Sequence, residues 1–337
     1  MSTNDTFAGR EIRLASRPSG EPTDANFALA TAQVGPPGEG QVLVRNAFVS
    51  VEPYMRGRMN DAKSYVPPFV VGEPLGGAAA GTVVVSRAPA IPVGATVLHM
   101  LGWREYAVLD AKAARVVDTA HVAPEQYLGA LGTTGFTAWV GLSAVGRAQA
   151  GETLFVSAAA GAVGSMAVQL AKRQGLRVIG SASSADKARF VVAELGADAA
   201  FDYHDGAAAK LGELAPEGID LYFDNVGGEQ LEAAIGATKD RARIVLCGSI
   251  SSYNAASPPP GPRNLHVAIQ RRLRLEGFIV SDHTARLGEF LGEVAPLVAR
   301  GAIKAPVTFV DGIENAPRAF MDILRPNANV GKVVVRL

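Results

Sequence analysis

The chain has 337 residues, of which 48% are hydrophobic, 19% charged and 7% aromatic. At roughly 150 residues per domain, this length predicts about two domains with full cores, and the composition excludes a disordered or fibrous chain. Thirty-two basic and thirty-two acidic side chains cancel. A balanced chain has no net field for nucleic acid or anionic lipid, so we expect neither partner, and any bound anion must be held by local geometry.

The single cysteine, Cys247, excludes disulfide frameworks and zinc sites built from several thiolates. The five histidines are scattered without the spacing of metal ligands. The first residues lack the apolar core of a signal peptide, and no apolar stretch reaches the roughly 18 residues of a membrane span. These features predict a soluble cytoplasmic protein without a metal site.

Valine-rich runs separated by glycine and proline fill the first third of the chain, and this texture predicts an antiparallel, partly barrel-like β domain. The predicted strands are 42–48, 82–86, 96–99, 106–109 and 115–117.

From about residue 153, apolar runs alternate with helical stretches, and this alternation predicts a parallel sheet covered on both faces. The predicted strands are 153–157, 177–181, 199–202, 219–224 and 243–246. The predicted helices between them are 163–174, 186–195, 207–214 and 229–237.

The last part of the chain continues with further predicted strands and helices, and we expect its tail to return to the first domain. A proline-rich loop at 257–262 cannot join a helix or a sheet ladder. The predicted elements after this loop are strand 274–280, helix 284–300, strand 307–310, helix 314–324 and strand 333–337.

A glycine-rich turn follows the predicted strand 153–157 and opens a helix, in the stretch SAAAGAVGSMAVQLAKRQG. Ala159, Gly161 and Gly164 fit the dinucleotide pattern G-x-G-x-x-G with alanine in the first place. Gly161 would let the backbone approach a pyrophosphate, Gly164 would allow close packing, and the helix N-terminus would face the phosphates. The alternative is a tight turn without a ligand.

The end of the second parallel strand distinguishes the two nicotinamide dinucleotides. A carboxylate there, about 20 residues after the glycines, would bind the ribose hydroxyls of NADH and repel a 2′-phosphate. Residues 180–187 read GSASSADK and place Ser181, Ser183 and Ser184 there, with Lys187 within reach. Hydroxyls and a cation favour NADPH, although a solvated lysine in a first helical turn is the alternative for Lys187.

The stretch CGSISSYN follows the predicted strand 243–246 at its carboxyl end, where ligands bind in doubly wound sheets. The phenol of Tyr253 could donate a hydrogen bond to a carbonyl oxygen that gains negative charge during reduction. The alternatives are a turn tyrosine with a solvated hydroxyl and, for Cys247, a packing role.

The stretch VEPYMRGRM at 51–59 places an aromatic ring, a thioether and a cation at one turn. Tyr54, Met55 and Arg56 could line a pocket. The alternative is a turn that Arg56 stabilises.

A series of stretches over nearly the whole chain resembles the zinc-independent medium-chain dehydrogenase/reductases. The resemblance is to the branch of prostaglandin reductases, plant alkenal double-bond reductases and bacterial curcumin reductase. The stretches are VEPYMRGRM, GWREYAV, LGTTGFTAWVGL, AAAGAVG, YFDNVGG, CGSISSYN, GPRN, RLEGFIVSD, ENAPRAF and NVGKVVV.

This resemblance implies an α/β protein with two domains. A GroES-like, β-rich catalytic domain would contain residues 1–127 and 302–337, and a Rossmann domain with a doubly wound parallel sheet would contain 128–301. The resemblance also implies a homodimer, in which the run 274–280 could pair between subunits.

The implied activity is NADPH-dependent reduction of the carbon–carbon double bond of an α,β-unsaturated aldehyde or ketone, which makes the enzyme an oxidoreductase acting on CH–CH groups. Tyr54 and Tyr253 would face the substrate, with Tyr253 as the catalytic hydrogen-bond donor. The residues expected to bind NADPH are Gly161, Ala162, Val163, Gly164, Ser183, Lys187, Tyr203, Asn225, Cys247, Gly248, Ser249, Ile250, Tyr253, Phe278, Ile279, Val280 and Asn329.

The chain departs from its relatives in two places. His204 and Asp205 follow Tyr203, where relatives often carry a lysine, and Val71-Gly72-Glu73 lacks the histidine of the zinc-binding cousins. Two other functions stay open at this point: a quinone reductase of the same fold, and a non-catalytic NADPH-binding sensor or structural protein.

Overall fold

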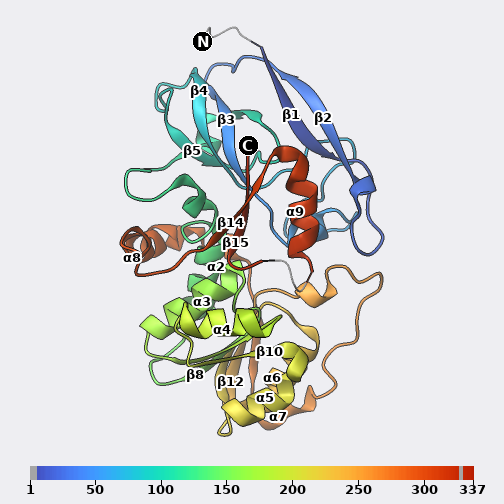
Figure 1. The fold of residues 1–337 in the computed structure, drawn as a ribbon, viewed down its shortest axis with the longest axis vertical. Coiled ribbons are helices and arrows are strands. Elements are labelled where there is room, and N and C mark those ends of the chain that lie inside the picture. The colour runs from blue at the N-terminus through green and yellow to red at the C-terminus, as the bar shows by residue number, and fades with distance from the viewer. Residues whose placement is uncertain (1–5, 326–328) are drawn as a thin grey trace. The chain divides into compact units, whose positions relative to one another are not determined.

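A computed structural model of the chain describes residues 6–325 and 329–337 (Figure 1). These residues form two compact units. The first unit contains residues 6–128, 307–325 and 333–337, and the second contains 129–306 and 329–332. None of the helices in the described part of the chain is long and apolar enough to cross a bilayer.

The first unit is rich in antiparallel strands, as the valine-rich runs predict. An antiparallel ribbon pairs β1 (Phe7–Leu14) with β2 (Phe27–Val34). A larger sheet, of seven strands within the described residues, is centred on β3 (Gln41–Ser50). Its other strands are β4 (Ala79–Ser86), β5 (Thr96–His99), β6 (Tyr106–Asp110), β7 (Arg115–Val116), β14 (Val307–Asp311) and β15 (Lys332–Arg336).

The alternation of valines along these strands buries one face. Val42 and Val44 of β3 share a buried cluster with Val83 of β4 and Val97 of β5. The last strand, β15, pairs antiparallel with β3, so the chain end returns to this unit. The unit also holds two short helices, α1 (Met55–Arg58) and α9 (Ala316–Ile323).

The second unit contains a six-stranded parallel sheet in the order β10-β9-β8-β11-β12-β13, which confirms the predicted doubly wound α/β fold. The strands are β8 (Thr153–Val156), β9 (Arg177–Ala182), β10 (Ala199–Asp202), β11 (Ile219–Asp224), β12 (Thr238–Leu246) and β13 (Arg274–Gly277). The helices that connect them are α3 (Ala162–Arg173), α4 (Ala185–Ala193), α5 (Ala207–Leu214), α6 (Gly228–Ala237) and α7 (His266–Gln270).

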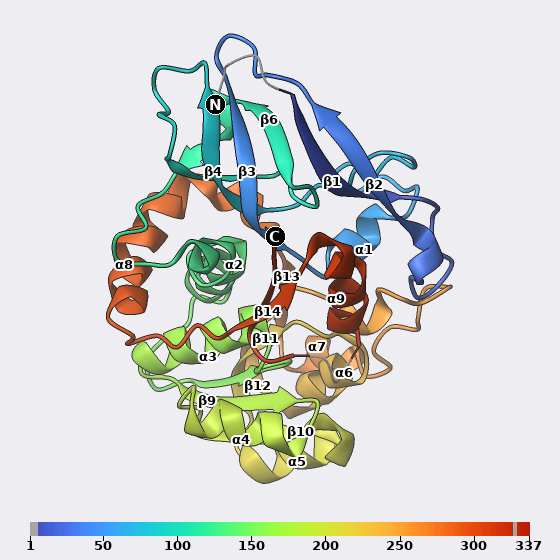
Figure 2. The ribbon, with the colours of Figure 1, turned by 45° about the horizontal axis from the view of Figure 1, so that its top comes forward.

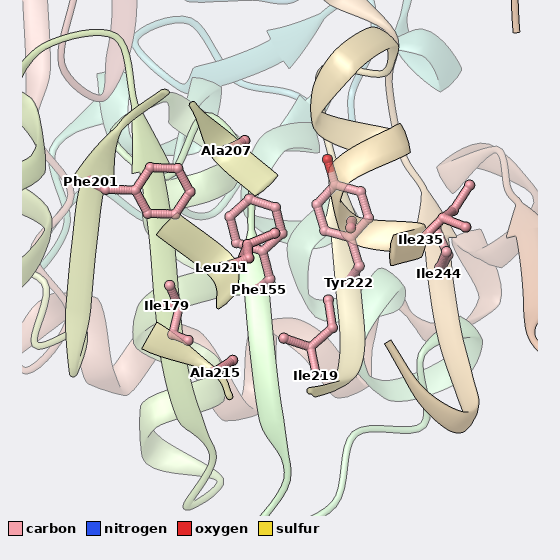
Figure 3. Close-up of a cluster of buried hydrophobic side chains, with 11 residues drawn as sticks. Phe155, Ile179, Phe201, Ala207, Leu211, Ala215, Ile219, Tyr222, Ile235 and Ile244 are labelled. Atoms are coloured by element: carbon pink, nitrogen blue, oxygen red, sulfur yellow. The ribbon is translucent and has the colours of Figure 1, made fainter. Parts of the chain in front are cut away.

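One face of this sheet is covered by an apolar cluster beneath α5 and α6. Figure 3 shows the rings of Phe201, Phe155 and Tyr222 in a row; they come from β10, β8 and β11. The ring of Phe155 stacks on both neighbours, with centroids 5.9 Å from Phe201 and 4.8 Å from Tyr222. Leu211 of α5 and Ile235 of α6 complete the cluster.

A further group of helices includes α2 (Thr133–Val140), which lies between α3 and α8 (Leu287–Ala299) in Figure 2. The helix α2 continues as a π turn over Gly141–Val145. A Cβ at Gly141 would lie 2.4 Å from the Phe223 ring of β11, so glycine is required for this close packing. Threonine and glycine are weak helix formers, which explains why composition does not predict α2.

The structure corrects several predicted boundaries, and the largest shift is at β12, which begins at Thr238 rather than at residue 243. The strand β13 ends at Gly277 rather than at residue 280. Residues Val280–Arg286 form a 3₁₀ turn, so the following helix begins at Leu287 rather than at 284.

Candidate functional site

The parallel sheet brings the predicted dinucleotide residues to one edge. Every parallel strand of the second unit leads into a stretch named from the sequence: 161–164 after β8 and four intervening residues, and, directly after their strands, Ser183 after β9, Tyr203 after β10, Asn225 after β11, 247–253 after β12 and 278–280 after β13. Because carboxyl ends of parallel strands share an edge, these stretches gather where ligands bind in such folds. The strand order reverses between the parallel strands β8 and β11, because β9 and β10 are added on one side of β8 and β11 to β13 on the other; this marks the switch point.

The glycine-rich turn joins β8 to α3 without room for larger side chains. A Cβ at Gly164 would lie 2.2 Å from the backbone oxygen of Ala158. Gly161 is the residue before α3 and caps it with no side chain. The first N–H groups of a helix, here those of Ala162, Val163 and Gly164, have no acceptor within the helix. They are available to an anionic group, and this geometry fits a pyrophosphate.

The segment Asn329–Lys332 lies beside this turn. The Gly331 N–H donates to the Ala160 oxygen at 2.8 Å, and Gly331 forms a bridge with Gly161. The φ of Gly331 is +69°, and a Cβ there would lie 2.2 Å from the Pro306 oxygen. The predicted residue Asn329 is therefore brought close to the glycine-rich turn by backbone pairing across a long stretch of sequence.

Lys187 and Ser183 form a polar pair after β9. The Lys187 Nζ donates to Ser183 Oγ at 3.2 Å, and burial lowers the pKa of Lys187. Lys187 forms no ion pair with a carboxylate in the described part of the chain. A half-buried ammonium group that forms no such ion pair suits a phosphate.

The other two serines of this stretch have structural roles. Ser181 is buried and donates to Oε1 of Gln230 at 2.5 Å, so its hydroxyl proton is not free to bind a phosphate. Ser184 caps α4 by accepting a hydrogen bond from the Lys187 N–H. Of the three hydroxyls considered from the sequence, that of Ser183 contacts the cation.

Asp224, which sequence reasoning does not single out, organises the turn after β11. Its Oδ1 accepts hydrogen bonds from Tyr222 Oη at 2.7 Å and from the N–H groups of Val226 and Gly227 at 2.9 and 2.8 Å. Burial raises the pKa of Asp224, and these bonds oppose the rise. The available signal was an acid at a strand end followed by the glycine pair of DNVGG.

Asn225 ties this turn to the end of β8. Its N–H donates to Ser157 Oγ at 2.9 Å, and its Nδ2 donates to the Ser157 oxygen at 2.7 Å. These bonds hold Asn225 at the switch point, close to the glycine-rich turn.

The loop after β12 is fastened to the turn after β11. The N–H groups of Cys247 and Gly248 donate to the backbone oxygen of Asp224 at 2.9 and 3.0 Å. The Ile250 N–H donates to the Asn225 oxygen at 3.3 Å, and Ser251 Oγ donates to the Val226 oxygen at 2.6 Å. The two loops therefore form one hydrogen-bonded layer at the sheet edge.

The hydroxyl of Tyr253 accepts a hydrogen bond from the Ser249 N–H at 3.3 Å. Burial raises the pKa of Tyr253 above its ordinary value of 10.0; the Ser249 bond opposes this, and Cys247 and Asp224 add to it. The phenol therefore stays protonated at neutral pH. A hydroxyl can accept and donate at the same time, so Tyr253 can donate its proton to a further acceptor while it accepts the Ser249 bond.

Cys247 is not activated as a nucleophile. Burial, followed by the charge of Asp224, raises the pKa of its thiol to about 12. The thiolate that would be needed for attack is therefore scarce at neutral pH, in agreement with a packing role.

Phe278, Ile279 and Val280 follow β13, and each is half-buried. The Phe278 ring reaches Gly141, where a Cβ would lie 3.3 Å from it. The π turn after α2 therefore contacts the last segment of this sheet edge.

Tyr54 belongs to the first unit, where it precedes the short helix α1. Burial, with a smaller contribution from Glu52, raises the pKa of Tyr54, while Arg58 opposes the rise. Arg56 is buried and donates to the Gly20 oxygen at 2.6 Å and to Asn60 Oδ1 at 2.7 Å. Its role is therefore to stabilise the turn, while Tyr54 remains a candidate for substrate contact.

The described part of the chain contains no group of three His, Cys, Asp or Glu side chains that could hold a metal ion. His99, for example, is buried against Asn46, with Nε2 at 2.8 Å from Asn46 Oδ1.

Comparison with known proteins gives matches over nearly the whole chain. A family model described as the N-terminal domain of oxidoreductase matches residues 10–117, and one described as zinc-binding dehydrogenase matches 162–296. The chain is 41% identical over 330 residues to the NADPH-dependent curcumin reductase of Escherichia coli, covering 96% of this chain and 95% of that protein. It is 35% identical to the 2-alkenal reductase (NADP(+)-dependent) of Nicotiana tabacum, covering 98% of each chain.

Among solved structures, the fold is similar to that of CurA from Vibrio vulnificus in complex with NADPH. The TM-score is 0.92 at 40% identity, covering 97% of this chain and 98% of that one. The chain belongs to the medium-chain dehydrogenase/reductases, in the zinc-independent branch that contains the curcumin, 2-alkenal and prostaglandin reductases.

Proposed function

We propose that this protein is an NADPH-dependent reductase of the carbon–carbon double bond in α,β-unsaturated aldehydes and ketones. The relatives named as curcumin, 2-alkenal and prostaglandin reductases support this class of substrate. The observation that carries the chemical part is the placement of the Tyr253 hydroxyl, which accepts the Ser249 N–H. Burial raises its pKa, so it would keep a proton to donate.

The residues at the sheet edge fit NADPH. The open N–H groups at the start of α3 would bind the pyrophosphate, and the Lys187–Ser183 pair would bind the 2′-phosphate, with Tyr203 on the neighbouring turn. Asn225, the loop 247–253, the segment 278–280 and Asn329 would complete the site. When bound, NADPH supplies a hydride to the carbon β to the substrate carbonyl.

Tyr253 would stabilise the charge that reduction creates. As the β carbon gains a hydride, the carbonyl oxygen gains negative charge, and the Tyr253 O–H donates a hydrogen bond to it. Such a donor contributes about 2.7–4 kcal/mol to the transition state. Protonation of the α carbon, by Tyr253 or water, completes the reduction, and Tyr54 would contact the rest of the substrate.

The direct test follows NADPH oxidation by chelator-treated enzyme with a 2-alkenal, an aryl enone, a naphthoquinone and a saturated aldehyde. The proposal predicts turnover of the alkenal and the enone, with saturated carbonyl products. Preference for the naphthoquinone would indicate a quinone reductase. Binding of NADPH without turnover of any acceptor would indicate a sensor or structural protein.

We further propose that the protein acts as a homodimer in the cytoplasm. The strand β13 has a single sheet neighbour, β12, within the described residues, so its outer edge can pair with a second copy. A lone cysteine and a reduced dinucleotide both fit a reducing compartment. Light scattering by the purified protein tests the assembly: a monomer would contradict it.

A further inference from the structure

The last residue of β10 is Asp202, and its carboxylate is hydrogen-bonded to His204. His204 Nδ1 lies 2.7 Å from Asp202 Oδ1, and the His204 backbone N–H donates to the same oxygen at 3.1 Å. Because a carboxylate can only accept, Nδ1 must carry the proton in this bond. The imidazole also lies against the Tyr203 ring, with centroids 4.0 Å apart.

This pair lies on the turn next to Lys187 and Ser183. The strands β9 and β10 run parallel, and Asp202 is in register with Ala182. The next residues, Tyr203 and Ser183, therefore begin neighbouring turns. The charge of Asp202 reaches the Tyr203 phenol, since after burial it is the cause that raises the pKa of Tyr203.

We propose that His204 is a specificity-determining residue for NADPH: by donating a hydrogen bond to Asp202, it weakens the repulsion between that carboxylate and the 2′-phosphate. This inference rests on the proposed function, because it takes the 2′-phosphate to lie between Lys187 and Tyr203. A carboxylate repels a phosphate of charge near −2, whereas the uncharged ribose hydroxyls of NADH carry no charge for it to repel. The lysine that relatives often carry next to the tyrosine would act directly on the phosphate, whereas His204 acts through its hydrogen bond to an acid.

The test compares the wild type with His204→Ala, Asp202→Asn and the double variant, and measures binding of NADPH and NADH by fluorescence titration without substrate. The His204→Ala variant keeps the backbone bond to Asp202, so the turn is retained. We expect it to weaken NADPH relative to NADH by about threefold to tenfold at low salt. The double variant lacks both His204 and the carboxylate of Asp202, so its preference for NADPH should return to that of the wild type.

Asp205→Asn is the matched control, because Asp205 is the adjacent exposed acid and has no bond to His204. Its effect on NADPH binding should be the same with and without His204, whereas that of Asp202→Asn should be larger in the His204→Ala background. The defect of His204→Ala should also shrink as salt screens the exposed charges. If an Asp202 variant does not fold, this salt dependence tests the proposal in its place.

An unchanged ratio of the NADPH and NADH affinities in His204→Ala overturns the inference, as does a defect that persists unchanged at high salt. These outcomes leave the proposed function intact. Failure of the wild type to bind NADPH at all would overturn both.

Discussion

At the scale of single residues, the Tyr253 hydroxyl has the clearest predicted effect on catalysis. Tyr253→Phe removes the donor while leaving the ring, so kcat on an enone should fall about 100-fold or more. The affinity for NADPH, measured by fluorescence titration, should change little. Tyr106→Phe is the matched control, because it removes a phenol from the first unit that we place in no site. Wild-type turnover by Tyr253→Phe would contradict the role.

Lys187 offers a second test at this scale. Lys187→Ala removes the cation beside Ser183, so NADPH should bind about 10- to 100-fold more weakly, as expected for a lost charge-assisted hydrogen bond. NADH lacks the phosphate and should be affected much less. Titration of both dinucleotides measures the difference, and equal losses would show that Lys187 does not contact the 2′-phosphate.

The sequence predicts the kinds of residue at the site but not which of several similar side chains is placed to bind. A serine and a lysine after the second parallel strand indicate a phosphate, but sequence does not distinguish Ser183 from Ser181, whose partner Gln230 lies 49 positions away. Asp224 is missed because its partners, two hydroxyls and two backbone N–H groups, are brought to it only by folding. The sequence shows only an acid at a strand end before a glycine pair.

At the scale of elements, two glycines in the turn from β8 to α3 have different predicted roles: Gly164 in packing and Gly161 in dinucleotide binding. A methyl group at Gly164 would overlap the Ala158 oxygen at 2.2 Å, whereas one at Gly161 would lie 3.2 Å from it. Gly164→Ala should lower the free energy of unfolding by about 1–3 kcal/mol. Gly161→Ala should cost less stability and mainly weaken NADPH. Thermal unfolding and dinucleotide titration check the pair, and the reverse order would contradict the assignment.

His99 links the strand β5 to the pH dependence of stability. Burial, followed by Arg104, lowers the pKa of His99 from 6.5 to about 4. The unfolded chain therefore takes up this proton at higher pH than the folded chain. The stability that neutral His99 provides is complete above pH 6.5 and is lost as the pH falls toward 4, a total of about 3 kcal/mol.

The variant His99→Gln should remove this part of the pH dependence. Denaturant unfolding of the first unit between pH 7 and pH 4 measures it. Identical pH slopes for the variant and the wild type would contradict the assignment.

Secondary structure was predictable where a single repeat of apolar residues dominated the sequence. Valine-rich runs correspond to β3, β4 and β5, and the alternating pattern after residue 153 corresponds to the parallel strands. The strands β1 and β2 were missed, because FAGREIRL and FALATAQV have few β-branched residues and depend on pairing with each other.

At the scale of the whole molecule, sequence predicted the β-rich and parallel-sheet parts but could not give the strand order. Strand order depends on contacts between segments far apart, such as Gly331 with Ala160 and Val334 with Ser50. These contacts explain why the final segment serves both units: residues 329–332 group with the dinucleotide unit and 333–337 with the β-rich unit.

Deuterium transfer tests the central proposal most directly. Chelator-treated enzyme would be supplied with an aryl enone and with NADPH deuterated on the transferred position, and the product examined by mass spectrometry and NMR. We predict a saturated ketone that carries one deuterium on the carbon β to an intact carbonyl. Deuterium on the carbonyl carbon of an allylic alcohol, or no transfer to any conjugated alkene, would contradict the account.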